Sequence, residues 1–208
     1  MGKVLVLSPH PDDDVIGCGG TIHQHIALGD RVEVLYLTSG ENGDHTKSSM
    51  DTMRIREKEA VAAAEILQVS DIEFWREPDG KLGASKKNIN RLMQKLMKYN
   101  PDVAYVTHMK EDHPDHQAAS SMLILSLRKL QSGFKPVVWM YEVWTPIQKI
   151  NRVVDISQYI HLKTQAIQAH QSQCAILRFD EAILGLNRYR GEMHSWPGGP
   201  YAEIFTAI

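Results

Sequence analysis

The hydrophobic positions of this chain follow two different periods. Five short segments are almost continuously apolar and rich in β-branched and aromatic residues, which is typical of buried strands. These segments are residues 3–7, 31–37, 71–75, 102–106 and 136–140. We therefore expect five strands that form the interior of a sheet.

Helical patterns fill the intervals between these segments. The clearest is an apolar stripe with the i, i+3, i+4, i+7, i+8 spacing of an amphipathic helix, formed by Ile89, Leu92, Met93, Leu96 and Met97. Helices are also expected over residues 52–67, 115–130 and 158–170. Alternating strands and helices predict βαβ units. No linker-like composition divides the chain, so residues 1–208 are interpreted as one Rossmann-like α/β domain, a mostly parallel sheet with helices on both faces.

Two polar clusters follow the first and the fourth predicted strands. Residues 8–14 read SPHPDDD, and residues 111–116 read EDHPDH. In an open parallel sheet, ligands bind outside the carboxyl ends of the strands, where the strand order reverses. A strand order of 3-2-1-4-5 would bring both clusters to the same crevice.

The first cluster places three consecutive carboxylates, residues 12–14, beside His10. Three like charges in one tight loop are costly unless a cation lies nearby. Helix capping explains one of the three, and Asp14 is the natural candidate for that role. The glycines at 17, 19 and 20 allow a phosphate-binding loop as a rival interpretation, but Ile22 stands where the dinucleotide fingerprint requires its last glycine.

The two clusters together can supply a metal site. Two histidines and one carboxylate are the ligands of several hydrolytic zinc centres, which keep an open position for water. His10, Asp13 and His116 can form that set, which leaves Asp12 and His113 as acid–base groups. A pair of histidines in a loop is by itself more often a solvated pair than a site.

Composition narrows the classes of partner. The chain has 208 residues, with 23 Lys and Arg against 25 Asp and Glu, and a net charge of −2 with histidine neutral. This balance argues against nucleic-acid binding. Cys18 and Cys174 are the only cysteines, so no thiolate metal site or disulfide framework is expected. Because no apolar run approaches the length of a membrane span or a signal peptide, we expect a cytoplasmic protein.

Residues 9–13 (PHPDD) and 113–116 (HPDH) resemble the PIG-L/LmbE family of zinc-dependent N-acetylglucosaminyl deacetylases. Residues 38–40, 56–59, 78–80, 170–173 and 201–205 are also similar to family patterns. The resemblance extends over nearly the whole chain. One departure is Asp14, where the family commonly has Glu.

The resemblance implies a role for each residue of the two motifs. His10, Asp13 and His116 would hold Zn²⁺, or another divalent metal, and Asp12 would be the general base for water. His113, in a protonated form, would stabilise the oxyanion or protonate the leaving amine. Asp115 would orient His113 or support the metal ligands.

Substrate recognition is less defined by the sequence. Arg56 is a candidate for gripping the substrate, although an exposed Arg paired with Glu59 explains the pattern equally well. His170 is expected to be structural. Segments 41–50 and 188–200 are the expected rim of the site, with Trp196 either stacking on a sugar or buried in the core.

The sequence therefore predicts a hydrolase of a linear amide bond. The reaction would remove the acetyl group from an N-acetylglucosamine conjugate or oligosaccharide and release acetate and a free amine. The alternative is a non-catalytic α/β module that binds a metal, a sugar or a nucleotide, since a fold does not fix a function. A metal-dependent phosphoesterase fits less well, because neither loop carries the expected cations. The oligomeric state stays open, with a homo-oligomer as one alternative.

Overall fold

The computed structural model describes residues 1–130 and 135–208. Seven strands form one sheet: β1 (Lys3–Ser8), β2 (Arg31–Thr38), β3 (Asp71–Glu77), β4 (Val103–Thr107), β5 (Val137–Tyr141), β6 (Arg152–Asp155) and β7 (Ala202–Ala207). Their order is β3-β2-β1-β4-β5-β7-β6, and the first five run parallel. This includes the order 3-2-1-4-5, the condition under which both polar clusters meet at one crevice.

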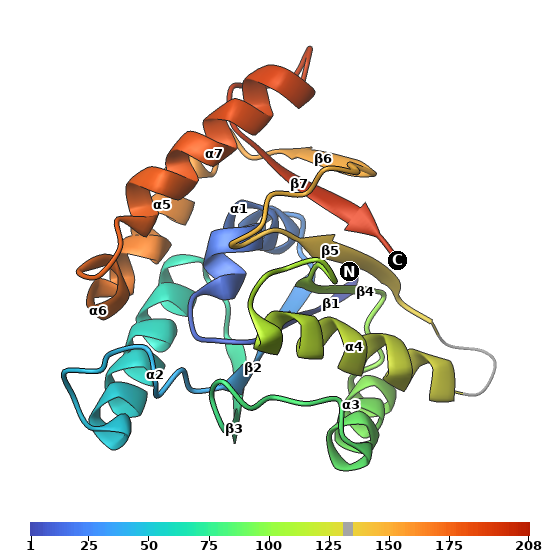
Figure 1. Ribbon diagram of the computed structural model, residues 1–208. Coiled ribbons are helices and arrows are strands. Elements are labelled where there is room, and N and C mark those ends of the chain that lie inside the picture. The colour runs from blue at the N-terminus through green and yellow to red at the C-terminus, as the bar shows by residue number, and fades with distance from the viewer. Residues whose placement is uncertain (131–134) are drawn as a thin grey trace.

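Helices cover both faces of the sheet (Figure 1). They are α1 (Asp13–Ala27), α2 (Ser49–Ile66), α3 (Lys86–Tyr99), α4 (Pro114–Lys129), α5 (Ile160–Ala169), α6 (Gln171–Cys174) and α7 (Phe179–His194). Alternate residues of β1 point to opposite faces, as its pleat requires. Val4 and Val6 pack in the core with α1, α2 and α5, whereas Leu5 and Leu7 pack in a second core with α3 and α4.

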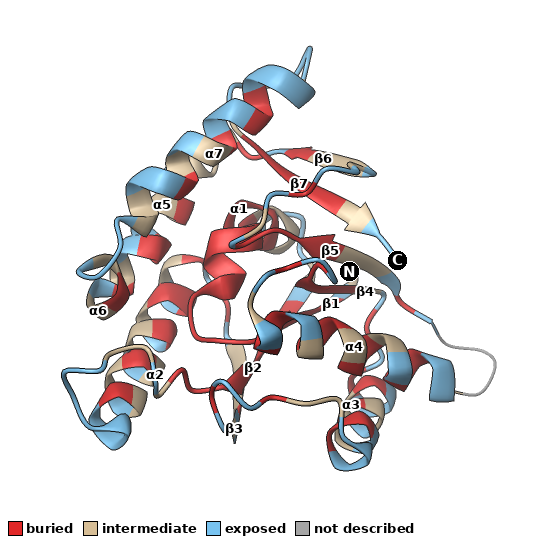
Figure 2. Cartoon of the chain, viewed as in Figure 1, coloured by how far each residue is buried: buried red, intermediate tan, exposed pale blue. Residues whose placement is uncertain are grey.

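The burial pattern explains why the central strands read as apolar runs. Figure 2 shows the strands at the centre of the sheet almost wholly buried, while the outer faces of α3, α4 and α7 are exposed. A strand that is covered on both faces has no solvent side for polar residues. The single α/β architecture expected from the sequence is confirmed.

The sequence did not reveal the carboxyl-terminal part of the sheet. β7 pairs antiparallel with β5 and β6, which adds two strands at one edge. β6 has only four residues, and β7 carries the buried polar residue Glu203. Both features obscure the apolar run that marks a buried strand. Helix α7 also occupies residues that were expected to form a loop.

The Glu203 carboxylate binds the backbone of α1 just after a kink in that helix. The backbone of α1 is not helical at Cys18, where φ is −144°. The Glu203 carboxylate accepts hydrogen bonds from the backbone N–H groups of Gly20 and Thr21, at 2.9 and 2.8 Å. It also pairs with buried Lys163 at 2.7 Å. The kink is therefore stabilised by a buried ion pair that satisfies the N–H groups beyond it.

Replacement of Glu203 by Ala is expected to destabilise the fold by roughly 3–5 kcal/mol, because it leaves the charge of Lys163 buried without a partner. Thermal or denaturant unfolding measures this effect. The matched control is Glu192→Ala, which breaks a surface pair with Arg188 whose two side chains are about half exposed and should change stability little. Equal effects in the two variants would contradict the role assigned to Glu203.

None of the helices within residues 1–130 and 135–208 combines the length and the apolar character needed to cross a bilayer.

Candidate metal centre

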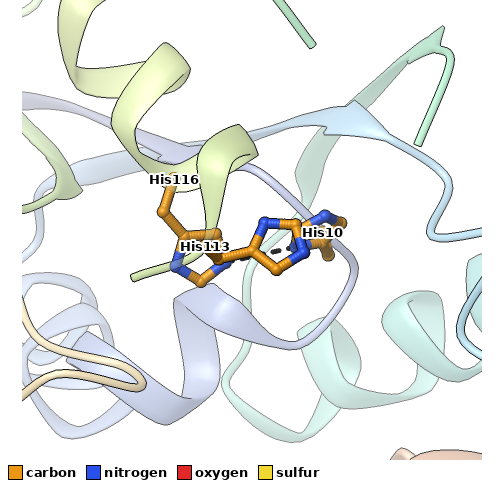
Figure 3. Close-up of side chains that lie close together, drawn as sticks. All are labelled: His10, His113 and His116. Carbon is orange, nitrogen blue, oxygen red and sulfur yellow. Dashed lines mark hydrogen bonds between the residues drawn. The ribbon is translucent and has the colours of Figure 1, made fainter. Parts of the chain in front are cut away.

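Two loops at the carboxyl ends of adjacent strands form the site. The loop between β1 and α1 carries His10, Asp12 and Asp13, and the loop after β4 carries His113 and His116 at the beginning of α4. Figure 3 shows that the three imidazole rings gather beside the first turn of α4. The expected convergence of the two sequence clusters on one crevice is thus observed.

Three donor atoms form a compact triangle. Asp13 Oδ2 lies 3.1 Å from His10 Nδ1 and 3.1 Å from His116 Nε2, and these two nitrogens are 3.2 Å apart. Ligand atoms around a tetrahedral zinc ion with bonds of about 2.0–2.1 Å lie about 3.3 Å apart. His10, Asp13 and His116 therefore present donors at the spacing that a small divalent metal requires.

Carboxylates face the other nitrogen of each histidine. His10 Nε2 lies 3.1 Å from Asp79 Oδ1 and 3.3 Å from Asp115 Oδ2. His116 Nδ1 lies 3.5 Å from Glu111 Oε2. Histidines that bind metals characteristically donate their second N–H to a carboxylate, which fixes the ring and makes it a better ligand. This arrangement leaves His10 Nδ1 and His116 Nε2 directed at the centre.

Other groups of donors also meet at His10. One group adds His113 to His10 and His116, and another joins His10 with Asp79 and Asp115. The Asp115 oxygens already accept backbone N–H bonds from residues 80 and 82, at 2.7 and 3.0 Å. Asp79 accepts the N–H of residue 42 at 2.9 Å. Asp13 Oδ2 also accepts a backbone N–H, that of His10, at 2.9 Å, but it lies 3.1 Å from a nitrogen of each of two histidines. The His10–Asp13–His116 triangle is therefore kept as the candidate metal site, with Asp79 and Asp115 behind His10.

The electrostatics of the triangle attract a cation. Burial lowers the pKa of His116, but Asp13 and Glu111 outweigh it and raise the value to about 9. Burial likewise opposes protonation of His10, whose pKa the surrounding carboxylates raise well above the usual range. Burial acts to raise the pKa of Asp13, but the two histidines hold it far below normal. A divalent cation satisfies the same excess of negative charge.

Asp12 lies beside the triangle in an unusual backbone conformation. Its φ is 143°, a region that side chains rarely adopt and that costs of order 1–3 kcal/mol. The side chain accepts a 3.0 Å hydrogen bond from Arg56 Nη2. Burial raises the pKa of Asp12 to about 6, against the opposing effect of Arg56. The carboxylate is thus ionised near pH 7 but more basic than an exposed one.

Arg56 is buried, so the alternative of an exposed pair with Glu59 is wrong. Only 4% of Arg56 is exposed, and its guanidinium donates to the carbonyls of Gly40 and Pro11 as well as to Asp12. A Cβ atom on Gly40, whose φ is +62°, would lie 2.1 Å from Arg56 Nη1. Glycine at position 40 therefore makes room for the guanidinium that holds Asp12.

His113 caps helix α4 with its ring. Its Nδ1 accepts the backbone N–H of Asp115 at 3.2 Å, so in the neutral ring the proton is on Nε2. Burial, together with the nearby His10 and His116, lowers the pKa of His113. The bond that Nδ1 accepts favours a neutral ring over the protonated form expected from the sequence. Its Nε2–H remains able to donate a hydrogen bond, and the residue lines the cavity.

Asp115 takes the second of its two expected places, behind a candidate metal ligand, whereas Asp14 differs from its expected role. The Asp115 side chain contacts His10, and its contact with His113 is made through its backbone. Asp14 was the candidate helix cap, but Asp12 occupies that position and has no side-chain cap bond. Asp14 instead accepts hydrogen bonds from Ser8 Oγ and Tyr36 Oη, and burial raises its pKa to about 7.

A cavity of about 300 Å³ opens over the triangle. Residues of both strand loops line it, together with two residues of the predicted rim, Asn42 and Gly43. The expectation for segment 188–200 is wrong, because residues to 194 belong to α7 and the segment supplies none of the described lining residues. Trp196 is 89% exposed, which also excludes a place in the core.

Sequence reasoning gave no role to Asp79 and Glu111, although both face metal-directed histidines. Each carboxylate lies in a polar segment that follows a strand, which the sequence shows. Only the fold shows that Asp79 approaches His10 Nε2 and that Glu111 approaches His116 Nδ1. His170 is buried, as a structural residue would be, and neither ring nitrogen has a hydrogen-bond partner among the described residues. Burial lowers its pKa to about 3.

Comparison with known proteins gives a consistent family relationship. Residues 5–125 match the PIG-L family, described as GlcNAc-PI de-N-acetylase. The chain is 30% identical over 186 residues to a diacetylchitobiose deacetylase of Thermococcus kodakarensis, with 82% of this chain and 70% of the relative covered. It is also 30% identical over 191 residues to a 4-oxalmesaconate hydratase of Pseudomonas putida, with 82% and 74% covered.

A solved structure extends the similarity to the whole fold. The N,N'-diacetylchitobiose deacetylase of Pyrococcus horikoshii, in complex with an inhibitor, has a TM-score of 0.87 and 30% identity. The match covers all of this chain and 84% of that protein. The matched family region includes both His-Pro-Asp motifs, and the relatives span most of the sequence. The chain therefore belongs to the PIG-L family.

Proposed function

We propose that this protein is a zinc-dependent N-deacetylase. Its substrate would be a small molecule or oligosaccharide that contains N-acetylglucosamine, and its products would be acetate and a free amine. The observation that carries the proposal is a triangle of three donor atoms with a fourth group, Asp12, held beside it and outside the ligand set. A protein that only binds a sugar has no need of this additional carboxylate.

Zinc suits the donor set of two imidazoles and one carboxylate, held by His10, Asp13 and His116. When bound, such an ion polarises a carbonyl and lowers the pKa of water to about 7. Another divalent metal with similar ligand preferences is the alternative. The chain's own groups supply the remaining chemistry.

Asp12 is proposed as the general base. Its carboxylate would accept a proton from the water that attacks the acetyl carbonyl, and its pKa of about 6 suits a base that operates near neutral pH. Arg56 would act as a positioning residue for Asp12. Its guanidinium is engaged by Asp12 and by two carbonyls, which argues against the earlier expectation that Arg56 grips the substrate.

His113 is proposed to stabilise the negative charge on the former carbonyl oxygen. The neutral ring donates through Nε2–H, because Nδ1 accepts the N–H of Asp115. The proton accepted by Asp12 can then pass to the departing nitrogen, which is a poor leaving group as an anion. Asp79 and Asp115 would hold His10 in its ligating orientation.

The direct test is release of acetate from N-acetylglucosamine compounds by the purified protein. The panel would contain N-acetylglucosamine itself, diacetylchitobiose, and the malate and inositol conjugates of N-acetylglucosamine. Each compound that is a substrate should yield one free amine and one acetate per turnover. Activity should disappear with a chelator and return with zinc. Turnover that is indifferent to exhaustive chelation would contradict the proposal.

A hydratase is the second candidate, because one relative of equal identity bears that name. Addition of water to a double bond would release no acetate, so an assay with 4-oxalmesaconate separates the two activities. The non-catalytic alternative predicts binding of a sugar or nucleotide without any turnover.

The charge of the lining residues bears on the substrate. Among the described lining residues, Arg56 is the one guanidinium or ammonium group, and it forms an ion pair with Asp12. This favours an uncharged substrate over a carboxylate.

Glu111→Gln is expected to weaken metal binding by about 10–100-fold. The substitution keeps the volume of Glu111, which is fully buried, but removes the charge that His116 Nδ1–H faces. Competition with a chromophoric chelator measures the dissociation constant. The matched control is Glu142→Gln, which alters a buried pair with Arg190. That control should lose stability and keep its metal affinity, and a comparable loss of affinity in both variants would remove Glu111 from this role.

A further inference from the structure

The cavity has two chemically different walls. The metal centre forms one wall. Apolar side chains form the other, and four of them are here called the apolar wall: Trp144, Ile176, Leu177 and Phe179. Ile16 and Val143, which are buried, line the same cavity. Trp144 is 49% exposed, Ile176 55% and Leu177 47%, although all three line a concavity beside a polar centre. Exposed apolar groups that gather in a cavity mark a binding surface.

The apolar wall is fixed relative to the metal ligands. The backbone N–H of Trp144 donates to Glu111 Oε2 at 3.2 Å, and the same oxygen faces His116 Nδ1. The Trp144 ring packs against Phe179 in a T-shaped contact with centroids 5.5 Å apart. The two aromatic rings are therefore held at a defined place, and both residues line the same cavity.

The charges in the cavity indicate what would contact this wall. Arg56 donates to Asp12, Gly40 and Pro11, so its Nη groups are occupied by the protein. No lysine is among the lining residues in the described part of the chain. Among these lining residues, an anionic group on the substrate would thus meet a guanidinium whose charge Asp12 already pairs, together with the carboxylates of Asp12 and Asp79.

We infer that the apolar wall binds the aglycone of the substrate, and that this aglycone is an uncharged apolar group, aryl or alkyl. The inference rests on the proposed deacetylation. The N-acetyl group would lie at the metal centre, and the substituent on the sugar would cover Trp144 and its apolar neighbours. Burial of an apolar group there removes both surfaces from water, at about 25 cal/mol per Å².

The test compares the phenyl and methyl glycosides of N-acetylglucosamine, each as both anomers. We expect kcat/KM to be about tenfold higher for the phenyl compound, which corresponds to about 1.4 kcal/mol. Trp144→Ala should bring the phenyl-to-methyl ratio of kcat/KM close to one, mainly by raising KM for the phenyl glycoside. The matched control is Trp196→Ala, because Trp196 is exposed and does not line the cavity.

Binding to the Asp12→Asn variant separates this inference from the proposed activity. Calorimetry of the two glycosides requires no turnover, and a tenfold tighter dissociation constant for the phenyl compound supports the apolar wall even when no acetate is released. Absence of turnover in the native protein would contradict the deacetylase proposal alone. Equal affinities for the phenyl and methyl glycosides would overturn the inference about the wall.

Two further outcomes would also overturn it. Preference for diacetylchitobiose over the phenyl glycoside would assign the wall to a second sugar, and preference for the malate conjugate would show that an anion is accepted. The remaining alternative is that a second copy of the chain covers the apolar wall. In that case Trp144→Ala would lower the molecular mass in sedimentation and leave the ratio of the glycoside affinities unchanged.

Discussion

Replacement of Asp12 by Asn is expected to lower kcat by about 10²–10⁴-fold, the usual contribution of a general acid–base group. Asn keeps the shape of the side chain and can still accept a hydrogen bond from Arg56, so the loop should retain its conformation. Because Asp12 is outside the donor triangle, the variant should bind as much metal as the native protein. Steady-state kinetics and metal analysis of the same sample test both statements.

The result would distinguish a base from a ligand. A loss of kcat with full metal content supports proton abstraction by Asp12, whereas a loss of both would place Asp12 among the metal ligands. Wild-type turnover by the variant would remove Asp12 from catalysis altogether. Circular dichroism and thermal unfolding provide the control for folding.

Substitution of Arg56 provides an independent test of proton abstraction by Asp12. If Arg56 acts only by holding Asp12, then Arg56→Lys should lower kcat in the native background. The same change should cost little in the Asp12→Asn background, because residues that act as a unit are not additive. Independent, multiplying effects would favour direct contact between Arg56 and the substrate.

The sequence predicted the part of the fold in which a strand is buried on both faces and therefore consists almost entirely of apolar residues. Strands β1 to β5 are covered by helices, so their apolar runs stand out. Their order has no sequence signal of its own; it was the condition under which the two polar loops would meet at one crevice. The antiparallel edge was not predictable in this way. β7 interrupts its apolar pattern with Glu203, which serves α1 rather than its own strand, and this pairing across more than 180 residues has no local signal.

The sequence predicted the part of the candidate site that is built from closely spaced histidines and aspartates, a combination with few structural roles. Histidines and aspartates in two short motifs indicated the candidate donor set, given an assumed strand order and the family resemblance. The groups that support it were less visible. Glu111 resembles any loop carboxylate, and Arg56 resembles any helical arginine paired with a nearby Glu. Its contact with Asp12 depends on the packing of α2 against the β1–α1 loop and on the space left at Gly40.

The strain at Asp12 and the burial around it suggest that the site is maintained at a cost to stability. A residue with φ of 143° in a buried loop persists only where its surroundings determine it. Arg56 supplies part of that constraint, and the adjoining ligand Asp13 supplies another. A bound divalent metal would fix the same loop through Asp13, so metal removal should lower the melting temperature as well as the activity.

Replacement of His116 by Ala is expected to abolish stable metal binding and, with it, the activity. The triangle has three protein donors, and loss of one leaves two, which is fewer than hydrolytic zinc sites use. The backbone of α4 should be unaffected, because Thr107 Oγ1 and Ser120 Oγ bond the carbonyl of residue 116 rather than its ring. Metal content after gel filtration should fall to less than about a tenth of an equivalent.

Truncation of a fully buried ring also creates a cavity, so a loss of metal could be attributed to unfolding. Two further variants exclude this explanation. His116→Gln fills most of the volume and should still lose the metal, because an amide is a poor zinc ligand. His23→Ala removes another buried histidine, which bonds Leu67 and is not among the residues that line the cavity. It should keep its metal, and full zinc occupancy in folded His116→Ala would refute the ligand assignment.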